Sequence, residues 1–451
     1  MISKKIDDRI MDMFNKGEFD NDFINIELDS FISTRLFNYQ YLHVYNLISC
    51  LKKNDVVIDG SDTGTGKTYT SLATVKHLKL TPIIICPKGS INIWKNVCNF
   101  FLIRPLFISN YEQIREGCSF LQINNKDYKW NINDPRKHIV IFDEAHKCRN
   151  VNTLNSKLLL SLKNVCKIML LSATLCDNPK NFTVFGYMLN FYDNLKKGKK
   201  WIENIILEQD KNKKSKQNII YKYIFPEKGS RMCLSDIKND FPMNQINVNC
   251  FDIDNKYVKL INNSYQNISK CSGAESLVKI NYERQQIEKL KIPIILDLIQ
   301  KYLEHNKSIA VFINYIETLT SISKSLDDLN VQYCKVDGSQ TLQERQKNID
   351  YFQTNKVKVI LCTIQSGGQS INLHDLDGKH PRVSLICPSF SSTELIQTLG
   401  RIYRVGLKSP ALQIILFCAD TVETKICEVM RKKINFLDKV TDNDLFGNIF
   451  K

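Results

Sequence analysis

The residues with the clearest chemical meaning are 61–68, which read SDTGTGKT. They follow Asp55–Asp59, a short apolar run whose β-branched content predicts a buried strand. Where a glycine-rich turn joins a strand to a helix, backbone N–H groups and the helix N-terminus attract phosphate. We therefore predict a phosphate-binding loop, in which Lys67 reaches the β- and γ-phosphates and the Thr68 hydroxyl binds Mg²⁺. The cofactor-binding residues predicted in this loop are Ser61, Asp62, Thr63, Gly64, Thr65, Gly66, Lys67 and Thr68.

This loop departs from the usual pattern at its first position. Ser61 stands where the pattern has glycine, and Gly60 lies one residue early. A glycine-rich turn that binds nothing is the alternative interpretation. The helical sequence that follows, TYTSLATVKHL, favours the phosphate loop, because the phosphate site needs a helix N-terminus directly after the turn.

Two adjacent carboxylates, Asp143 and Glu144, follow a second strand-like run at 138–141. A nucleoside triphosphatase needs one carboxylate to hold Mg²⁺ through its water shell and another to orient and deprotonate the attacking water. We predict that Asp143 supports the metal and that Glu144 is the general base. An isolated DEAH string could instead be an exposed acidic helix cap, but its position after a strand and a phosphate loop favours catalysis.

Two arginines near the end of the chain, Arg401 and Arg404, are one helical turn apart. On a helix they would project to one side and could meet the charge that develops on a γ-phosphate. A basic, solvated helix face is the alternative. That alternative explains the arginines but not the preceding Gln397 and Gly400.

These motifs, in this order, resemble those of superfamily 2 helicase-type ATPases with a DEAH box. The string SAT at 172–174 is similar to the third motif, and the resemblance implies that Ser172 and Thr174 link the ATP site to the nucleic-acid track. It also implies that His146 couples the second motif to the third. A histidine that is simply packed in a polar interface is the alternative.

Two later segments resemble the fifth and sixth motifs of that superfamily. They are TIQSGGQSINL at 363–373, which contains Gly368 as a predicted cofactor contact, and QTLGRIYR at 397–404. The resemblance implies that Gln397 senses the γ-phosphate and that Arg401 and Arg404 complete the site from a second domain.

Several short strings are similar to the Swi/Snf-type branch, whose members track along duplex DNA. In LFNYQ at 36–40, the resemblance implies that the Gln40 amide reads the adenine edge. PKGSINIW at 87–94 and SNYEQIR at 109–115 resemble nucleic-acid motifs, and VETKICEVMRKK at 422–433 resembles the helix that closes the second motor domain. The chain is also similar to compact helicase-like ATPases of large DNA viruses, which serve transcription or genome handling.

Composition limits the class of protein independently of this resemblance. With 451 residues, 43% of them hydrophobic, the chain predicts about three packed domains. Fifteen cysteines without a C-x-x-C pair argue against a disulfide framework and a zinc site. No apolar run approaches the roughly 18 residues of a membrane helix, and the N-terminus lacks a secretory segment. We expect no membrane partner and an intracellular, reducing location, which for a viral protein means the host cytoplasm or the virion.

The charge balance predicts a polyanionic partner. The formal net charge is +15, with 62 Lys and Arg against 47 Asp and Glu, and counterion release rewards a basic surface on nucleic acid. We expect nucleic acid as the partner, with duplex DNA preferred. A coding bias toward lysine is the alternative cause. The lysine-rich stretch 196–216 could be a phosphate-tracking arm or a solvated loop.

Alternating strand-like and helical runs predict an α/β fold of two tandem RecA-like parallel-sheet motor domains with an irregular basic insertion between them. The expected divisions are an N-terminal extension (1–30), motor domain one (31–189), an insertion and connector (190–289), motor domain two (290–440) and a C-terminal tail (441–451).

The expected function is an ATP- and Mg²⁺-dependent nucleic-acid motor that translocates along duplex DNA, and the transcription machinery is a candidate partner. One alternative is a strand-separating DNA or RNA helicase, for which Phe225 and Phe241 were the candidate aromatic wedge residues. Others are a catalytically idle nucleic-acid scaffold and a small-molecule kinase. The sequence leaves the oligomeric state open.

Overall fold

The computed structural model describes residues 26–124, 127–173, 175, 179–211, 219–233, 242–251, 258–259, 274–367, 371–388, 391–404, 406–419, 421 and 423. These residues form two compact units, which divide between residues 239 and 240. Each unit contains its own sheet, and in both sheets every described pair of neighbouring strands is parallel.

The first unit is built on a six-stranded sheet in the order β3-β2-β6-β7-β1-β8. Its inner strands β1 and β7 are buried along almost their whole length and are mostly apolar, which is typical of a parallel sheet covered on both faces. The strands are β1 (Val56–Asp59), β2 (Thr81–Cys86), β3 (Phe107–Asn110), β6 (His138–Asp143), β7 (Lys167–Leu171) and β8 (Gly229–Ser230).

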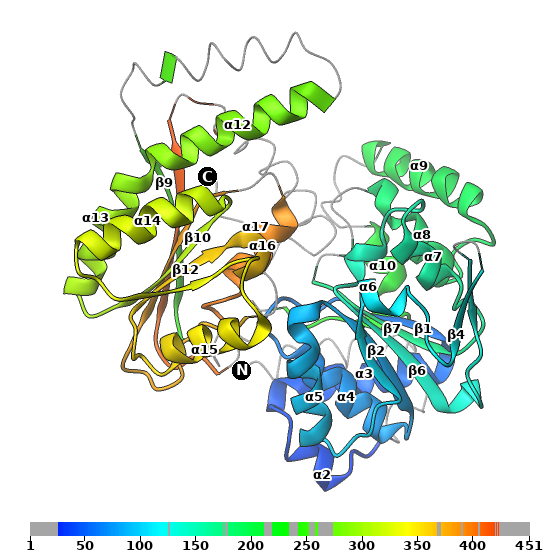
Figure 1. The fold of residues 1–451 in the computed structure, drawn as a ribbon. Helices are drawn as coiled ribbons and strands as arrows, with labels where there is room; N and C mark the ends of the chain where they lie inside the picture. The colour runs from blue at the N-terminus through cyan, green and yellow to red at the C-terminus, as the bar shows by residue number, and fades with distance from the viewer. Residues whose placement is uncertain are drawn as a thin grey trace. The chain divides into compact units, whose positions relative to one another are not determined.

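Helices cover both faces of this sheet (Figure 1). Alternate strand residues, such as Val57 and Ile58, belong to two different hydrophobic core clusters, one on each face. One face is covered by α2 (Ser30–Ser33), α3 (Tyr41–Lys53), α4 (Lys67–His77) and α5 (Ile91–Phe100). The other is covered by α6 (Tyr111–Ile114), α7 (Leu154–Leu160), α8 (Thr183–Met188), α9 (Leu195–Lys211) and α10 (Ile219–Ile224). Shorter elements are the antiparallel hairpin β4 (Leu121–Asn124) and β5 (Asp127–Trp130), and the 3-10 turns η1 (Asn38–Gln40), η2 (Lys88–Ser90), η3 (Pro135–Lys137), η4 (Ala145–Cys148) and η5 (Pro179–Phe182).

The second unit has a six-stranded sheet in the order β11-β12-β10-β13-β14-β9. The strands are β9 (Asn244–Phe251), β10 (Ser308–Ile313), β11 (Tyr333–Val336), β12 (Val359–Thr363), β13 (Arg382–Ile386) and β14 (Ala411–Cys418). The core on one face is closed by α13 (Ile292–Glu304) and α14 (Ile316–Asp328). The remaining helices are α12 (Ala274–Leu290), α15 (Leu342–Gln353), α16 (Ile364–Gly367) and α17 (Ser392–Leu399) (Figure 1).

The predicted fold class, two parallel α/β sheets, is confirmed. The stretch 190–289, expected as one irregular insertion, contributes β8 to the first sheet and β9 to the second. The difference arises because β8 has only two residues, too few to show a pattern, and because β9 (NQINVNCF) is not a continuous apolar run of the kind from which the sheets were predicted. The domain boundaries stay predictions.

Part of the lysine-rich stretch is helical. Its residues up to 211 form α9, where the Trp201 ring stacks on Phe191 with 5.3 Å between centroids. The rest of this stretch, from 212 to 216, lies outside the described residues, as do residues 1–25 of the expected N-terminal extension and all but residue 423 of the closing helix expected at 422–433. Among the helices that the structure describes, none is long and apolar enough to cross a membrane.

Candidate functional site

The predicted phosphate loop joins β1 to α4 at the carboxyl end of the first sheet. Gly64 (φ 84°) and Gly66 (φ 95°) have left-handed backbone angles, which favour glycine. A Cβ atom on Gly66 would lie 2.5 Å from Nε2 of Gln40, so a side chain at this position would also collide with its neighbour. Both glycines are therefore required by the backbone path of the loop.

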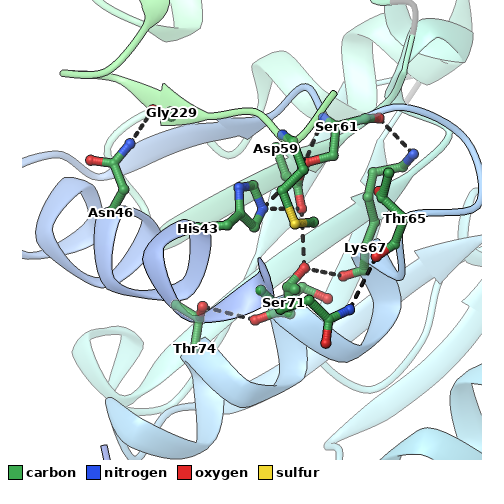
Figure 2. A network of polar contacts seen from close by, with 12 residues as sticks. His43, Asn46, Asp59, Ser61, Thr65, Lys67, Ser71, Thr74 and Gly229 are labelled. Carbon is green, nitrogen blue, oxygen red and sulfur yellow. Dashed lines mark hydrogen bonds and ion pairs between the residues drawn. The ribbon is translucent and has the colours of Figure 1, made fainter. Parts of the chain in front are cut away.

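Lys67, the first residue of α4, folds back over the loop. Its Nζ donates to the carbonyl oxygens of Ser61 at 2.8 Å and Asp62 at 2.9 Å (Figure 2). Thr65 closes the same turn, since its hydroxyl donates to the Asp62 carbonyl at 2.9 Å. Thr68, the predicted metal ligand, follows in the first turn of α4 and is half-buried. Thr63 lies half-buried within the loop.

The carboxylate of Asp143 lies at the same edge of the sheet, because β6 ends there and its neighbour β7 pairs with β1. Its Oδ2 accepts from Trp94 Nε1 at 2.9 Å, and its carbonyl accepts from the Tyr111 hydroxyl at 2.7 Å. Burial, and then the charge of Glu144, raise the pKa of Asp143 to about 6, while Trp94 and Lys67 oppose that rise. Lys67 is therefore close enough to act on Asp143 electrostatically.

Glu144 has a left-handed backbone (φ 56°), which is uncommon for a residue with a Cβ atom and turns the chain sharply after β6. His146 lies beside it, with Nδ1 3.2 Å from Glu144 Oε2 and 3.3 Å from Ser172 Oγ. The structure thus brings the second and third motifs together through this histidine. Thr174 lies outside the described residues. The coupling role remains a proposal.

Gln40 makes contacts that differ from the expected adenine recognition. Its Oε1 accepts from the Phe37 N–H at 3.0 Å and its Nε2 donates to the Thr65 carbonyl at 3.0 Å. The side chain is 2% exposed, and a buried amide of this kind must have hydrogen-bond partners. In this structure Gln40 supports the phosphate loop, and adenine recognition stays a prediction.

The spacing of Arg401 and Arg404 predicts that both lie on one helix. In the structure of the second unit they do not. Helix α17 ends at Leu399, with Gly400 as its C-cap, and both arginines lie in the turn that follows. Arg401 caps this end of the helix, since its Nε donates to the Gln397 carbonyl in the last turn at 2.8 Å.

The two arginines nevertheless converge. Nη1 of Arg401 and Nη1 of Arg404 donate to the Ile371 carbonyl at 3.2 and 3.4 Å, and Arg404 also donates to Asn372 Oδ1. Arg401 is 6% exposed, which excludes a solvated basic face at this residue. Gln397 is buried as well, and Gly368 lies outside the described residues.

Sequence reasoning missed several polar residues that support the loop. His43, on α3, has Nε2 3.0 Å from Asp59 Oδ2 at the end of β1, and both side chains are almost fully buried (Figure 2). Burial alone would raise the pKa of Asp59, but His43 and then Lys67 hold it below the usual value. Trp94 and Tyr111 were within strings assigned to nucleic-acid motifs, whereas His43 had no sequence signal.

Replacing His43 by leucine is expected to lower the free energy of unfolding by about 3 kcal/mol, because it leaves the buried Asp59 carboxylate without the imidazole that contacts it. The double variant with Asp59→Asn is expected to lose less. The pKa of Asp59 is lower in the folded protein than in the unfolded chain. Its ionised carboxylate therefore stabilises the fold above the unfolded pKa of about 3.9, and this stabilisation is lost as the pH falls through the folded-state pKa. Urea unfolding at neutral pH measures the free energy of unfolding of each variant. A His43→Leu protein as stable as the unsubstituted protein would contradict the prediction.

Comparison with known proteins agrees with this geometry. Residues 290–406 match the model of the helicase conserved C-terminal domain. A protein of Acanthamoeba polyphaga mimivirus, whose name proposes an ATP-dependent RNA helicase, is 36% identical over 97% of this chain and 89% of its own length. The ISWI chromatin-remodeling complex ATPase of Saccharomyces cerevisiae is 21% identical over 90% of this chain and 41% of its own length. The SWI2/SNF2 ATPase core of Sulfolobus solfataricus, solved in complex with dsDNA, covers 93% of this chain and 94% of its own at 18% identity, with a TM-score of 0.36.

The motifs, the parallel sheets and the mimivirus relative define a helicase-type ATPase. The chain belongs to the ATP-dependent helicase family of that relative and is a nucleic-acid-dependent ATPase, with sequence similarity to Swi/Snf-like enzymes such as the yeast ISWI ATPase. The family expected from the sequence motifs is therefore confirmed.

Proposed function

We propose that this protein uses ATP hydrolysis to translocate along duplex DNA. The observation that carries the proposal is the gathering of Lys67, Asp143, Glu144 and His146 at the carboxyl ends of neighbouring strands, with Ser172 bonded to His146. This edge of a parallel sheet is where ligands bind in open α/β folds. A residue of each chemical type that ATP hydrolysis requires is present there.

The residues present suit ATP with Mg²⁺. The loop offers backbone N–H groups and the Lys67 ammonium for phosphate, and the Thr68 hydroxyl and Asp143 carboxylate are the hard oxygen donors that Mg²⁺ prefers. When bound, Mg²⁺ would be held by Thr68 and Asp143 and would neutralise the charge that develops on the phosphates. Trp94 orients Asp143 by donating to Oδ2, which keeps the carboxylate aimed in one direction.

In the proposed mechanism, Glu144 orients the attacking water and accepts its proton, while Lys67 moves from the loop carbonyls to the phosphates. Gln397 senses the γ-phosphate, and Arg401 and Arg404 supply positive charge to the transition state. His146 transmits the state of Glu144 to Ser172, whose hydroxyl is 3.3 Å away. Each of these roles is a proposal for the residue named.

Support for DNA as the track comes from the Swi/Snf-like strings at 87–94 and 109–115 and from the net charge of +15. A strand-separating RNA helicase is the second candidate, favoured by the name of the mimivirus relative. The proposed role in transcription or genome handling inside an infected cell rests on the resemblance of the motifs to helicase-like ATPases of large DNA viruses. An idle scaffold is disfavoured because Lys67, Asp143 and Glu144 are all present.

An unwinding helicase needs an element that intercepts each base pair. Phe225 was one candidate for such a wedge, but its ring packs against Gly60, where an added Cβ would lie 2.6 Å from the ring edge. It also belongs to the periphery of the sheet's core. Phe241, the other candidate, lies outside the described residues. The packing of Phe225 therefore favours translocation over unwinding.

Triplex displacement and tailed-duplex unwinding, measured on one preparation, distinguish the two candidates. We expect ATP-dependent release of the third strand with little separation of the duplex, because opening each base-pair step costs about 1.4 kcal/mol and needs a wedge. Lys67→Ala protein serves as the ATP-independent control. Efficient unwinding without triplex displacement would show that the second candidate is correct.

A further inference from the structure

The start of the phosphate loop is hydrogen-bonded to a distant segment of the same unit, residues 229–232. Strand β8 pairs with β1, and the ladder then continues beyond both strands into the loop. The Gly60 N–H donates to the Ser230 carbonyl at 3.0 Å, and the Asp62 N–H donates to the Met232 carbonyl at 3.0 Å. The loop is therefore braced by backbone that lies far from it in sequence.

Two side chains of the loop strengthen this brace. Ser61 accepts from the Met232 N–H through its hydroxyl at 3.0 Å, a bond that the usual glycine could not make. Asp62 Oδ1 is 3.2 Å from Nη2 of Arg231, and both side chains are 2% exposed. Removing one partner of a buried ion pair leaves the other charge buried without compensation, which destabilises the protein. Arg231 therefore stabilises the buried Asp62 carboxylate.

The segment also lies very close to β1. A Cβ atom on Gly229 would be 2.2 Å from the Ile58 carbonyl oxygen, so only glycine permits this approach. Asn46 on α3 fixes the same turn by donating through Nδ2 to the Gly229 carbonyl at 3.0 Å (Figure 2). A shift of the loop is therefore expected to displace residues 229–232.

Lys67 supplies a reason for the loop to shift. It donates to the Ser61 and Asp62 carbonyls, and these are the two residues that Met232 and Arg231 hold from the other side. When Lys67 turns to the phosphates of a nucleotide, it must release both carbonyls. Residues 61 and 62 then keep their contacts to 230–232 while losing those to Lys67. Binding of a nucleotide would thus replace the arrangement of Lys67 seen here by a second one.

We propose that Arg231 is a positioning residue that couples nucleotide binding at the loop to segment 229–233, from which the chain continues into the second unit. The inference rests on the proposed function, since it requires ATP to bind at Lys67. It assigns a role to the Ser61 departure from the usual loop pattern and to a residue outside the motifs recognised in the sequence. The coupling works through the ion pair with Asp62 and the hydroxyl of Ser61.

Amide hydrogen exchange of the full chain, with and without a non-hydrolysable ATP analogue and Mg²⁺, tests the proposal. In the unsubstituted protein we expect the analogue to slow exchange at residues 229–233 by about fivefold or more, the lower end of typical coupling. In Arg231→Met protein that still binds a fluorescent ATP analogue, we expect most of this slowing to disappear. Stimulation of ATP turnover by DNA is expected to fall with it by a similar factor.

Lys228→Met is the matched control, because it removes a nearby cation that does not contact the loop. Nζ of Lys228 donates instead to Asn54 Oδ1, at the end of α3. We expect this variant to keep both the exchange response and the stimulation. If Arg231→Met does not fold, Arg231→Lys carries the test, since lysine keeps the charge but loses the planar fork and should give an intermediate response. Thermal unfolding of each variant identifies a loss of fold.

Two outcomes would overturn the inference: nucleotide binding to the unsubstituted protein without any change at 229–233, or an Arg231 variant that binds nucleotide and responds like the unsubstituted protein. Failure of the unsubstituted protein to bind the nucleotide at all would instead contradict the proposed function. The two failures are thus separated by the binding measurement made on the same sample.

Discussion

Glu144→Gln is expected to reduce ATP turnover by about 10²- to 10⁴-fold while ATP still binds, because the substitution removes a general base but no phosphate contact. Lys67→Ala is expected to abolish turnover by a different route, since it removes the ammonium that approaches the phosphates, and ATP binding should weaken substantially. Steady-state turnover and equilibrium binding of a fluorescent ATP analogue, measured on both variants, separate the two effects.

Glu116→Gln is a suitable control for this experiment, because Glu116 is an exposed carboxylate outside the site. It should behave like the unsubstituted protein. Near-normal turnover by purified Glu144→Gln protein would contradict the assignment of Glu144 as the base. His146 lies 3.2 Å from the Glu144 carboxylate and is also bonded to Ser172. We therefore expect the same variant to lose, in addition, the coupling to Ser172.

Arg404→Ala is expected to reduce turnover by about 10³- to 10⁵-fold with nucleotide affinity largely intact, because charge supplied to the transition state acts on the chemical step. Arg404 is the better of the two arginines to test. Arg401 is buried and its Nε donates to the Gln397 carbonyl in the last turn of α17, so its removal is also expected to disturb the end of that helix. Single-turnover hydrolysis alongside nucleotide binding measures the effect.

Arg404→Lys sharpens the test, because lysine preserves the charge without the planar guanidinium. We expect it to recover only part of the lost rate. Lys408→Ala, at an exposed cation a short distance along the chain, is the control and should hydrolyse ATP normally. Turnover by Arg404→Ala close to that of the control would mean that Arg404 does not act on the transition state.

The parts of the site that could be predicted are those encoded locally. The phosphate loop follows a buried strand and precedes a helix within a few residues, and the DEAH carboxylates follow another strand in the same way. Local order of this kind is visible in sequence because each element has its own periodicity. The two parallel sheets follow from the repetition of such runs.

The missed parts depend on contacts between distant residues. Arg231 and Asp62 are 169 positions apart, and β8, which brings them together, has only two residues. The His43–Asp59 pair likewise requires α3 to pack over β1. The end of α17 at Leu399 was missed because it depends on how Arg401 bonds back to the last turn, which the arginine spacing alone does not show.

The central claim is that a nucleic acid stimulates ATP hydrolysis at Lys67, Asp143 and Glu144. It is tested most directly by steady-state ATP turnover of the unsubstituted protein and of Glu144→Gln, each without nucleic acid and with single-stranded DNA, duplex DNA or RNA. We predict turnover that duplex DNA raises most and that Glu144→Gln abolishes in every condition. Turnover that no nucleic acid changes, or that survives in Glu144→Gln, would contradict the claim.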